Sequence, residues 1–356
     1  MKTKFFGKKI TGILTLLPET EYNFEEDMEY NNLSEKQNRK LQKTMGYDRH
    51  RIFKKDTYLS KVAVFGINHM IEEKMIEKED ISAIVLSTTS PDYLMPPTSN
   101  IIMEGVGLNN DVFCMDTNQQ CAGFTNGLLQ SFMLLNNDNM KKVLLITGDV
   151  MARNPDRSNT SSYPLSGDAI CITVVENCNK NLPIYLHTDI NAKNYDALVF
   201  PDKGWRESTE EEKEKFASDR YGGYDYLPCL HMDGQAVFQY VMQDVPKYIN
   251  ETLEYAGVTS DSLDYFLFHQ PNKFMVDKLA QKIKVSSEKV PSNIVTYYGN
   301  SNGSTIPVSI CHNLKDTVLE DKINCMLAGF GAGLSYSGII MEIGNFDFCE
   351  MLITSY

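Results

Sequence analysis

One cysteine stands at a turn that could make its thiol a nucleophile. Cys121 lies between a short apolar run at 112–115 and a helix-like apolar run at 124–135. This order predicts a strand, a tight turn and a helix, with the thiol near the start of the helix. A helix N-terminus carries partial positive charge and free N–H groups, which favour the nucleophilic thiolate. Ala122 and Gly123 leave room for a substrate, although most intracellular cysteines are inert core residues.

The other cysteines offer weaker chemistry. No Cys-x-x-Cys pair occurs in the chain, so the spacing typical of zinc sites and thioredoxin-like motifs is missing, and no metal site is expected. Eight cysteines without a secretory segment indicate reduced thiols and a cytoplasmic protein. Lys8 and Lys9 interrupt the N-terminal run that could have formed a signal peptide. Four cysteines lie in apolar runs typical of a core: Cys114, Cys171, Cys311 and Cys325.

Composition and charge narrow the possible functions. The 356 residues, 42% of them hydrophobic, can bury one large core or two fused ones. A net charge of −13 argues against a nucleic-acid-binding surface, and no apolar run approaches the length of a transmembrane helix. The most basic segment, residues 273–289, is typical of a solvated helix face, yet it leaves room for an acidic partner to dock locally.

The chain contains an internal repeat. Similar elements recur at a nearly constant offset of 179 to 183 positions, which indicates a duplicated half. We therefore predict two halves, residues 1–180 and 181–356. Each half alternates strands and helices, which favours α/β layering, and segments 112–149 and 293–333 should both form strand, turn, helix and strand. The paired positions are Ile81 with Leu263, Cys121 with Asn300, and Gly148 with Gly331.

Two polar residues of the second half could assist the cysteine. His269 follows the apolar residues 266–268, and Pro271 ends that strand, so the imidazole should lie at a strand end, where α/β proteins build sites. Asn300 lies in a turn before a helix, in a sequence that is also simply good turn chemistry. The repeat places these two residues and Cys121 at equivalent edges of related halves. We therefore expect all three in one pocket between the halves.

Residues 201–229 interrupt the repeat. They contain a run of acidic and basic residues, then a loop rich in tyrosine and glycine, and the only tryptophan, Trp205. We expect a surface insertion with a short acidic helix, which is either simply solvated or acts as a lid or partner contact.

These motifs together resemble the thiolase-superfamily condensing enzymes, most closely β-ketoacyl-acyl-carrier-protein synthase III. The resemblance implies an α/β, thiolase-like five-layered αβαβα fold with two duplicated halves, assembled as a homodimer. Further segments stand in family order: residues 88–90 followed by Pro96, 148–150 followed by Ala152 and Arg153, 167–169, and the glycine-rich 329–335.

The resemblance also implies roles for particular residues. Cys121 would carry the acyl group, and His269 and Asn300 would hold the carbonyl oxygen of a malonyl thioester. The backbone N–H groups of Cys121 and Ala332 would form the oxyanion hole. Met95 stands where an aromatic residue from the partner subunit usually shapes the acyl pocket. Acyl-CoA or acyl-carrier-protein thioesters are the implied substrates, with neither a metal nor a redox cofactor.

Some positions depart from the family pattern. Family members that use coenzyme A clamp its adenine between a tryptophan and an arginine, where this chain has Lys40 and Thr160. This difference favours a specialised fatty-acid, polyketide or acyl-modification pathway over acetyl-CoA priming. Of the basic face that docks acyl-carrier protein, Lys273 and Lys282 remain, whereas Phe274 replaces an expected arginine.

Three other functions fit parts of the sequence. The order Cys, His, Asn is that of papain-like hydrolases, but the second cysteine and the aromatic residue of their signature are missing around Cys121. An acyltransferase of the same fold could move the acyl group to a hydroxyl or amine, although Asn300 favours condensation. A non-catalytic subunit of a synthase pair would be expected to lack Cys121.

Overall fold

The fold is built on two large β-sheets. The computed structural model describes residues 1–30, 33–152, 163–201, 204–217 and 230–356. In this part of the chain the first sheet has six strands, ordered β15-β2-β8-β7-β5-β6, and the second has five, ordered β1-β9-β14-β13-β12. The strands of the first sheet are β15 (Phe348–Thr354), β2 (Lys8–Pro18), β8 (Ala169–Asn177), β7 (Lys142–Asp149), β5 (Ile81–Ser87) and β6 (Phe113–Thr117). Those of the second are β1 (Lys2–Phe6), β9 (Pro183–Ile190), β14 (Ser335–Gly344), β13 (Lys322–Gly331) and β12 (Tyr265–Phe268).

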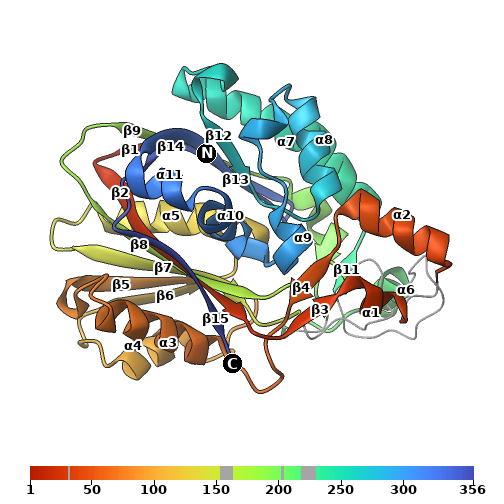
Figure 1. Ribbon diagram of the computed structural model, residues 1–356, viewed down its shortest axis with the longest axis horizontal. Coiled ribbons are helices and arrows are strands. Elements are labelled where there is room, and N and C mark those ends of the chain that lie inside the picture. Colours follow the sequence, from red (N-terminus) through yellow and green to blue (C-terminus); the bar gives the residue numbers. More distant parts are fainter. Residues whose placement is uncertain (31–32, 153–162, 202–203, 218–229) are drawn as a thin grey trace.

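Helices cover both outer faces of the sheets and fill the space between them. Figure 1 shows α3 and α4 on one outer face and α7 and α8 on the opposite one, with α5 and α10 between the sheets. The outer helices are α3 (Leu59–Glu72), α4 (Thr98–Val106), α7 (Gly234–Ala256) and α8 (Lys273–Lys282). The central helices are α5 (Gly123–Leu134), α10 (Thr305–Asn313) and α11 (Lys315–Glu320).

The three largest hydrophobic clusters follow these layers. One lies between the sheets and includes Phe124, Phe132 and Ile310 from the central helices. Another joins α3 and α4 to the first sheet, and the third joins α7 and α8 to the second. Each sheet is therefore buried on both faces, which explains its long apolar strands. The five-layered αβαβα prediction is confirmed.

The internal repeat is visible in the chain path, with one exception. β5 corresponds to β12, α5 to α10, and β7 to β13, as the sequence predicts. The strand expected at the start of segment 293–333 is wrong, because residues Ile294–Tyr298 form a short helix, α9. In the first sheet β6 pairs with β5. In the second sheet no strand pairs at the corresponding place, because β12, the counterpart of β5, is the edge strand. The segment that corresponds to β6 is therefore the helix α9, which packs against α10 and β4 (Arg49–Arg51).

The terminal strands are exchanged between the sheets. β1 pairs with β9 in the second sheet, and β15 pairs with β2 in the first. A cut near residue 180 therefore separates the two halves along the chain but not every strand of each sheet. The division at residue 180 stays a prediction.

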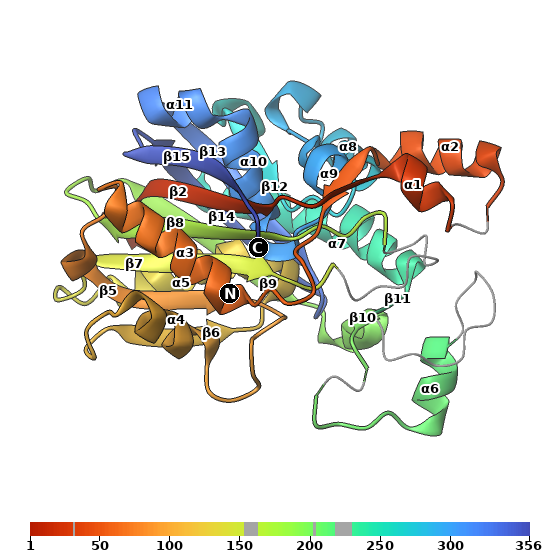
Figure 2. The same cartoon turned by 60° about the horizontal axis from the view of Figure 1, so that its bottom comes forward.

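The remaining elements extend to one side of the layers. Figure 2 shows α1, α2 and α6 projecting there. Their bounds are α1 (Phe24–Met28), α2 (Glu35–Met45) and α6 (Glu210–Ala217), and two small sheets pair β3 (Glu21–Asn23) with β4 and β10 (Leu198–Val199) with β11 (His231–Met232). α6 is the predicted acidic helix, whereas the tyrosine and glycine loop lies outside the described residues. No helix in the described ranges is long and apolar enough to cross a membrane.

Candidate active site

The predicted cysteine turn forms between β6 and α5. After β6 ends at Thr117, a single 3-10 turn covers Gln120–Ala122, and α5 begins at Gly123. Gln120 has φ of 49°, a left-handed conformation that costs energy for a residue with a side chain. This conformation makes the turn sharp and brings Cys121 to the start of the helix. The Cys121 side chain is nonetheless buried.

Backbone from the second half packs directly against this turn. A Cβ atom added to Gly331, the last residue of β13, would lie 2.9 Å from Cys121 Sγ. One added to Gly303, in the short turn η6 (Asn302–Ser304), would lie 2.8 Å from the backbone oxygen of Gln120. Only glycine allows such close approach. The two halves therefore meet at the cysteine.

The protonation state of the thiol differs from the sequence prediction. Burial, reinforced by the nearby Asp149 carboxylate, raises the pKa of Cys121 to about 12, whereas its own backbone amide acts in the opposite direction. The expected preference for thiolate is wrong for the folded chain, because desolvation outweighs the field of one helix end. Cys121 is therefore a neutral thiol near pH 7.

His269 follows β12 directly, as predicted. Its backbone N–H donates to Ala328 O at 2.9 Å, which continues the pairing of β12 with β13. The ring lies edge-on to Phe330, with centroids 5.8 Å apart. Burial lowers the pKa of His269 to about 3, so the imidazole is neutral near pH 7. A neutral imidazole has one N–H group, and its tautomer decides which nitrogen can donate.

Two oxygen atoms compete for the Nδ1 atom of His269. Thr305 Oγ1 lies 2.8 Å from it and Asn302 O lies 3.1 Å from it. A carbonyl oxygen can only accept, whereas the Thr305 hydroxyl has one proton that it can donate either to Nδ1 or to Asn302 O, which lies 3.0 Å away. When Thr305 donates to Nδ1, the proton of His269 is on Nε2, which is then the N–H donor of the ring.

Asn300 is held through both its backbone and its side chain. Its N–H donates to Leu165 O at 2.6 Å, and its carbonyl accepts from the Gly167 N–H at 3.1 Å. Its side-chain Oδ1 accepts from the Asn302 N–H at 2.9 Å. The Nδ2 group is thus left as the donor of a half-buried amide.

The turn η6 links the three predicted residues. Asn302 binds Asn300 through its N–H and His269 through its carbonyl, and the next residue, Gly303, packs on the Cys121 turn. The structure therefore brings Cys121, His269 and Asn300 to one locus between the halves. Their chemical roles stay predictions.

Sequence reasoning missed the residues that support this locus. The Asn302 amide donates to Asp149 Oδ2 at 3.0 Å, and residues 88–90 donate to the other carboxylate oxygen. Burial raises the pKa of Asp149. From the sequence, Asp149 was only one residue of the family segment 148–150, and Thr305 was only one residue of the helix expected after Asn300. Nothing local in the sequence distinguishes either residue from ordinary turn or core residues.

Comparison of this sequence with models of known protein families gives two matches. The sequence model described as 3-oxoacyl-[acyl-carrier-protein (ACP)] synthase III matches residues 115–194, and that of its C-terminal part matches residues 253–343. Both parts of the chain are thus similar to the 3-oxoacyl-[acyl-carrier-protein] synthase III family. These matches support a condensing enzyme of the thiolase superfamily.

Individual relatives agree with this family over most of the chain. A Campylobacter jejuni protein provisionally named 3-oxoacyl-[acyl-carrier-protein] synthase 3 is 28% identical over 99% of both chains. A β-ketoacyl-[acyl-carrier-protein] synthase III of Lactococcus lactis is 29% identical over 80% of this chain and 84% of its own. The crystal structure of a Burkholderia xenovorans 3-oxoacyl-(acyl-carrier protein) synthase matches with a TM-score of 0.92 and 26% identity, covering 99% of each chain.

The other residues to which the family resemblance assigns a place differ in how far they are exposed to solvent. Ala332 is half-buried in the turn between β13 and β14, directly after Gly331. Met95 is 86% exposed, so its side chain is not packed into the described part of its own chain. Lys40 is exposed on α2, and Thr160 lies outside the described residues.

Proposed function

We propose that the chain makes a carbon–carbon bond by decarboxylative Claisen condensation, with Cys121 as the nucleophile. In the first half-reaction the thiol attacks an acyl thioester. The acyl group moves to sulfur, and the thiol proton passes to the released thiolate of the carrier. Small neighbours and a helix N-terminus assist a sulfur that must become negative as it attacks.

In the second half-reaction, a malonyl thioester loses CO₂ and becomes an enolate. Its carbon attacks the acyl group, Cys121 leaves as a thiolate, and the sulfur takes a proton from solvent. We assign His269 Nε2 and Asn300 Nδ2 as the two donors to the enolate oxygen. Neutral donors aimed at the oxygen where charge develops lower the barrier without reorganisation.

The backbone N–H groups of Cys121 and Ala332 are the proposed oxyanion hole for the tetrahedral intermediate. The close packing of Gly331 on the cysteine, where an added Cβ would lie 2.9 Å from Sγ, supports this assignment, because Ala332 is the next residue along the chain. Alanine serves as well as glycine here, since the donor is the backbone amide.

The observation that carries the proposal is the position of η6. One short turn binds both proposed donors and touches the cysteine turn. A hydrolase that uses a cysteine would need histidine to activate the thiol, whereas the contacts of His269 run through η6 and prepare it as a neutral donor.

We further propose a homodimer formed along β6. This strand is the edge of the first sheet, and Phe113 on it is 42% exposed. The nearby loop exposes Tyr93, Leu94 and Met95, an apolar group that a second copy could cover. Met95 would then reach the acyl pocket of the partner subunit.

The donor is proposed to be an acyl thioester on acyl-carrier protein or coenzyme A, used in a specialised cytoplasmic pathway. Exposed Lys40 gives no aromatic surface for adenine, which favours a carrier protein over coenzyme A. The cysteines in the described ranges are all free, as reduced thiols should be.

Acyl transfer to the cysteine can be tested by intact-mass spectrometry. The purified protein is incubated with a panel of acyl-CoAs and acyl-carrier proteins, beside Cys121→Ala. We expect a covalent acyl adduct on the wild type alone. No adduct across the whole panel would refute the enzyme mechanism, and an adduct on the variant would refute the role of Cys121.

Decarboxylation separates condensation from acyl transfer to a hydroxyl or amine. We expect malonyl-pantetheine to lose CO₂ partly without Cys121, and to be stable with His269→Ala or Asn300→Ala. Normal acylation without any decarboxylation would favour the acyltransferase alternative.

A further inference from the structure

A buried carboxyl–imidazole pair lies near the candidate site but outside it. Asp27 of α1 and His50 of β4 are each 1% exposed, and His50 Nε2 lies 3.1 Å from Asp27 Oδ2. The rings of Tyr22 and Tyr163 flank the imidazole, with centroids 5.8 and 5.3 Å away. Burying two ionisable side chains is costly, so such a pair calls for an explanation.

The other nitrogen of His50 holds a particular backbone carbonyl. His50 Nδ1 lies 2.6 Å from Ser166 O. Because a carbonyl only accepts, Nδ1 must carry a proton. The Asp27 carboxyl packs against the opposite edge of the ring, at Nε2, and so helps to hold the ring with Nδ1 facing Ser166.

Ser166 belongs to the segment that positions Asn300. Ser166 and Asn300 form a parallel β-bridge, and the flanking hydrogen bonds join Leu165 O and Gly167 N to the Asn300 backbone. The two segments approach so closely that a Cβ added to Gly167 would lie 2.0 Å from the backbone oxygen of Tyr298. A shift of residues 165–167 must therefore shift Asn300.

We propose that His50, oriented by Asp27, is a positioning residue for the Asn300 amide. It fixes the Ser166 carbonyl, and through the bridge it fixes the backbone from which Asn300 presents Nδ2. The inference rests on the proposed function, in which Asn300 acts in decarboxylation but not in the loading of Cys121. Loss of His50 should therefore slow one half-reaction selectively.

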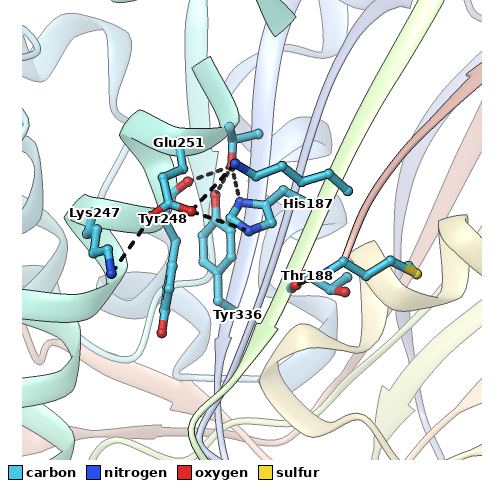
Figure 3. A network of polar contacts seen from close by, with 9 residues as sticks. His187, Thr188, Lys247, Tyr248, Glu251 and Tyr336 are labelled. Atoms are coloured by element: carbon cyan, nitrogen blue, oxygen red, sulfur yellow. Dashed lines mark hydrogen bonds and ion pairs between the residues drawn. The ribbon is translucent and has the colours of Figure 1, made fainter. Parts of the chain in front are cut away.

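A second buried histidine provides the matched control. His187 of β9 is 2% exposed, and its Nδ1 lies 3.1 Å from Thr252 Oγ1. Figure 3 shows it in a polar network with Glu251 and Tyr336, between α7 and the second sheet. Removing this imidazole also breaks buried hydrogen bonds, but it leaves the Ser166–Asn300 bridge intact.

The test compares both half-reactions in four variants: His50→Ala, His50→Asn, His187→Ala and Asn300→Ala. Acyl loading of Cys121 is followed by intact mass and decarboxylation by CO₂ release from malonyl-pantetheine, with folding checked by thermal melting. We expect His50→Ala to slow decarboxylation by about 10- to 100-fold, as a misplaced catalytic group does, and to leave acyl loading nearly unchanged. His50→Asn, which keeps an N–H donor at the Nδ1 position, should recover most of the rate.

Other outcomes identify which idea fails. Equal loss of both half-reactions in His50→Ala, or the same selective loss in His187→Ala, would show a merely structural role and overturn the inference. If His50→Ala does not fold, failure of His50→Asn to decarboxylate better than Asn300→Ala would overturn it as well. Full decarboxylation by Asn300→Ala would instead refute the proposed function of Asn300 itself.

Discussion

The Thr305 hydroxyl should decide which nitrogen of His269 carries the proton. It is fully buried and lies 2.8 Å from Nδ1 and 3.0 Å from Asn302 O, and its donation to Nδ1 is the arrangement that leaves the His269 proton on Nε2. In Thr305→Val the shape is kept and the hydroxyl is lost. Nδ1 then faces only Asn302 O, an acceptor at 3.1 Å, so the proton should move to Nδ1. Nε2 would meet the enolate oxygen with a lone pair instead of an N–H group.

The size of the effect follows from the loss of one oxyanion donor. Such losses lower the rate by about 10²- to 10³-fold, equivalent to roughly 2.7–4 kcal/mol of transition-state stabilisation. Thr305→Ser keeps the hydroxyl and should stay close to wild type. The valine variant also leaves the Gln270 N–H without its 3.3 Å partner, so its melting temperature should fall even though acyl loading continues.

The assay is decarboxylation of malonyl-pantetheine in the Cys121→Ala background, with acyl loading measured separately in the Cys121 enzyme. Imidazole ¹⁵N shifts of His269 report the tautomer directly. Decarboxylation by Thr305→Val at the rate of Thr305→Ser would refute the argument. So would a valine variant whose proton remains on Nε2.

Three further predictions concern stability, packing and assembly. Because the pKa of His269 is about 3 in the fold and 6.5 ordinarily, only the unfolded chain takes up a proton there between these pH values. His269 should therefore lower the unfolding free energy by up to about 1.4 kcal/mol per pH unit as the pH falls from about 6 to 3. Urea titrations at several pH values should show a weaker pH dependence of the unfolding free energy for His269→Asn than for the wild type. Gly331→Ala should slow acyl loading of Cys121, since the new Cβ would lie 2.9 Å from Sγ, whereas Gly234→Ala, with open space around it, should load normally in the same mass assay. Phe113→Asp should dissociate the proposed dimer in analytical ultracentrifugation, and an unchanged sedimentation coefficient would count against β6 as the interface.

The layered fold could largely be read from the sequence. Apolar runs bounded by turn residues predict β5, β7 and β13, and a constant offset between the halves predicts how they recur. The strand predicted at residues 293–298 failed because local apolar character does not tell whether a pairing partner is available. Ile294 and Val295 are buried in a helix instead, at the place where the second sheet ends.

The sequence by itself determined which side chains could do chemistry and on which elements they lie. A thiol before a helix and an imidazole after a strand are local patterns, and each was found where it was predicted, whereas Asn300 lies in a β-bridge with Ser166 just before the turn η6. The tertiary structure alone decided their protonation states and supports. Desolvation makes Cys121 a thiol and His269 a neutral imidazole, and it depends on atoms brought from distant parts of the chain. The same is true of Thr305 and His50, whose hydrogen bonds to the site span 36 and 116 positions of the chain and leave no local signal.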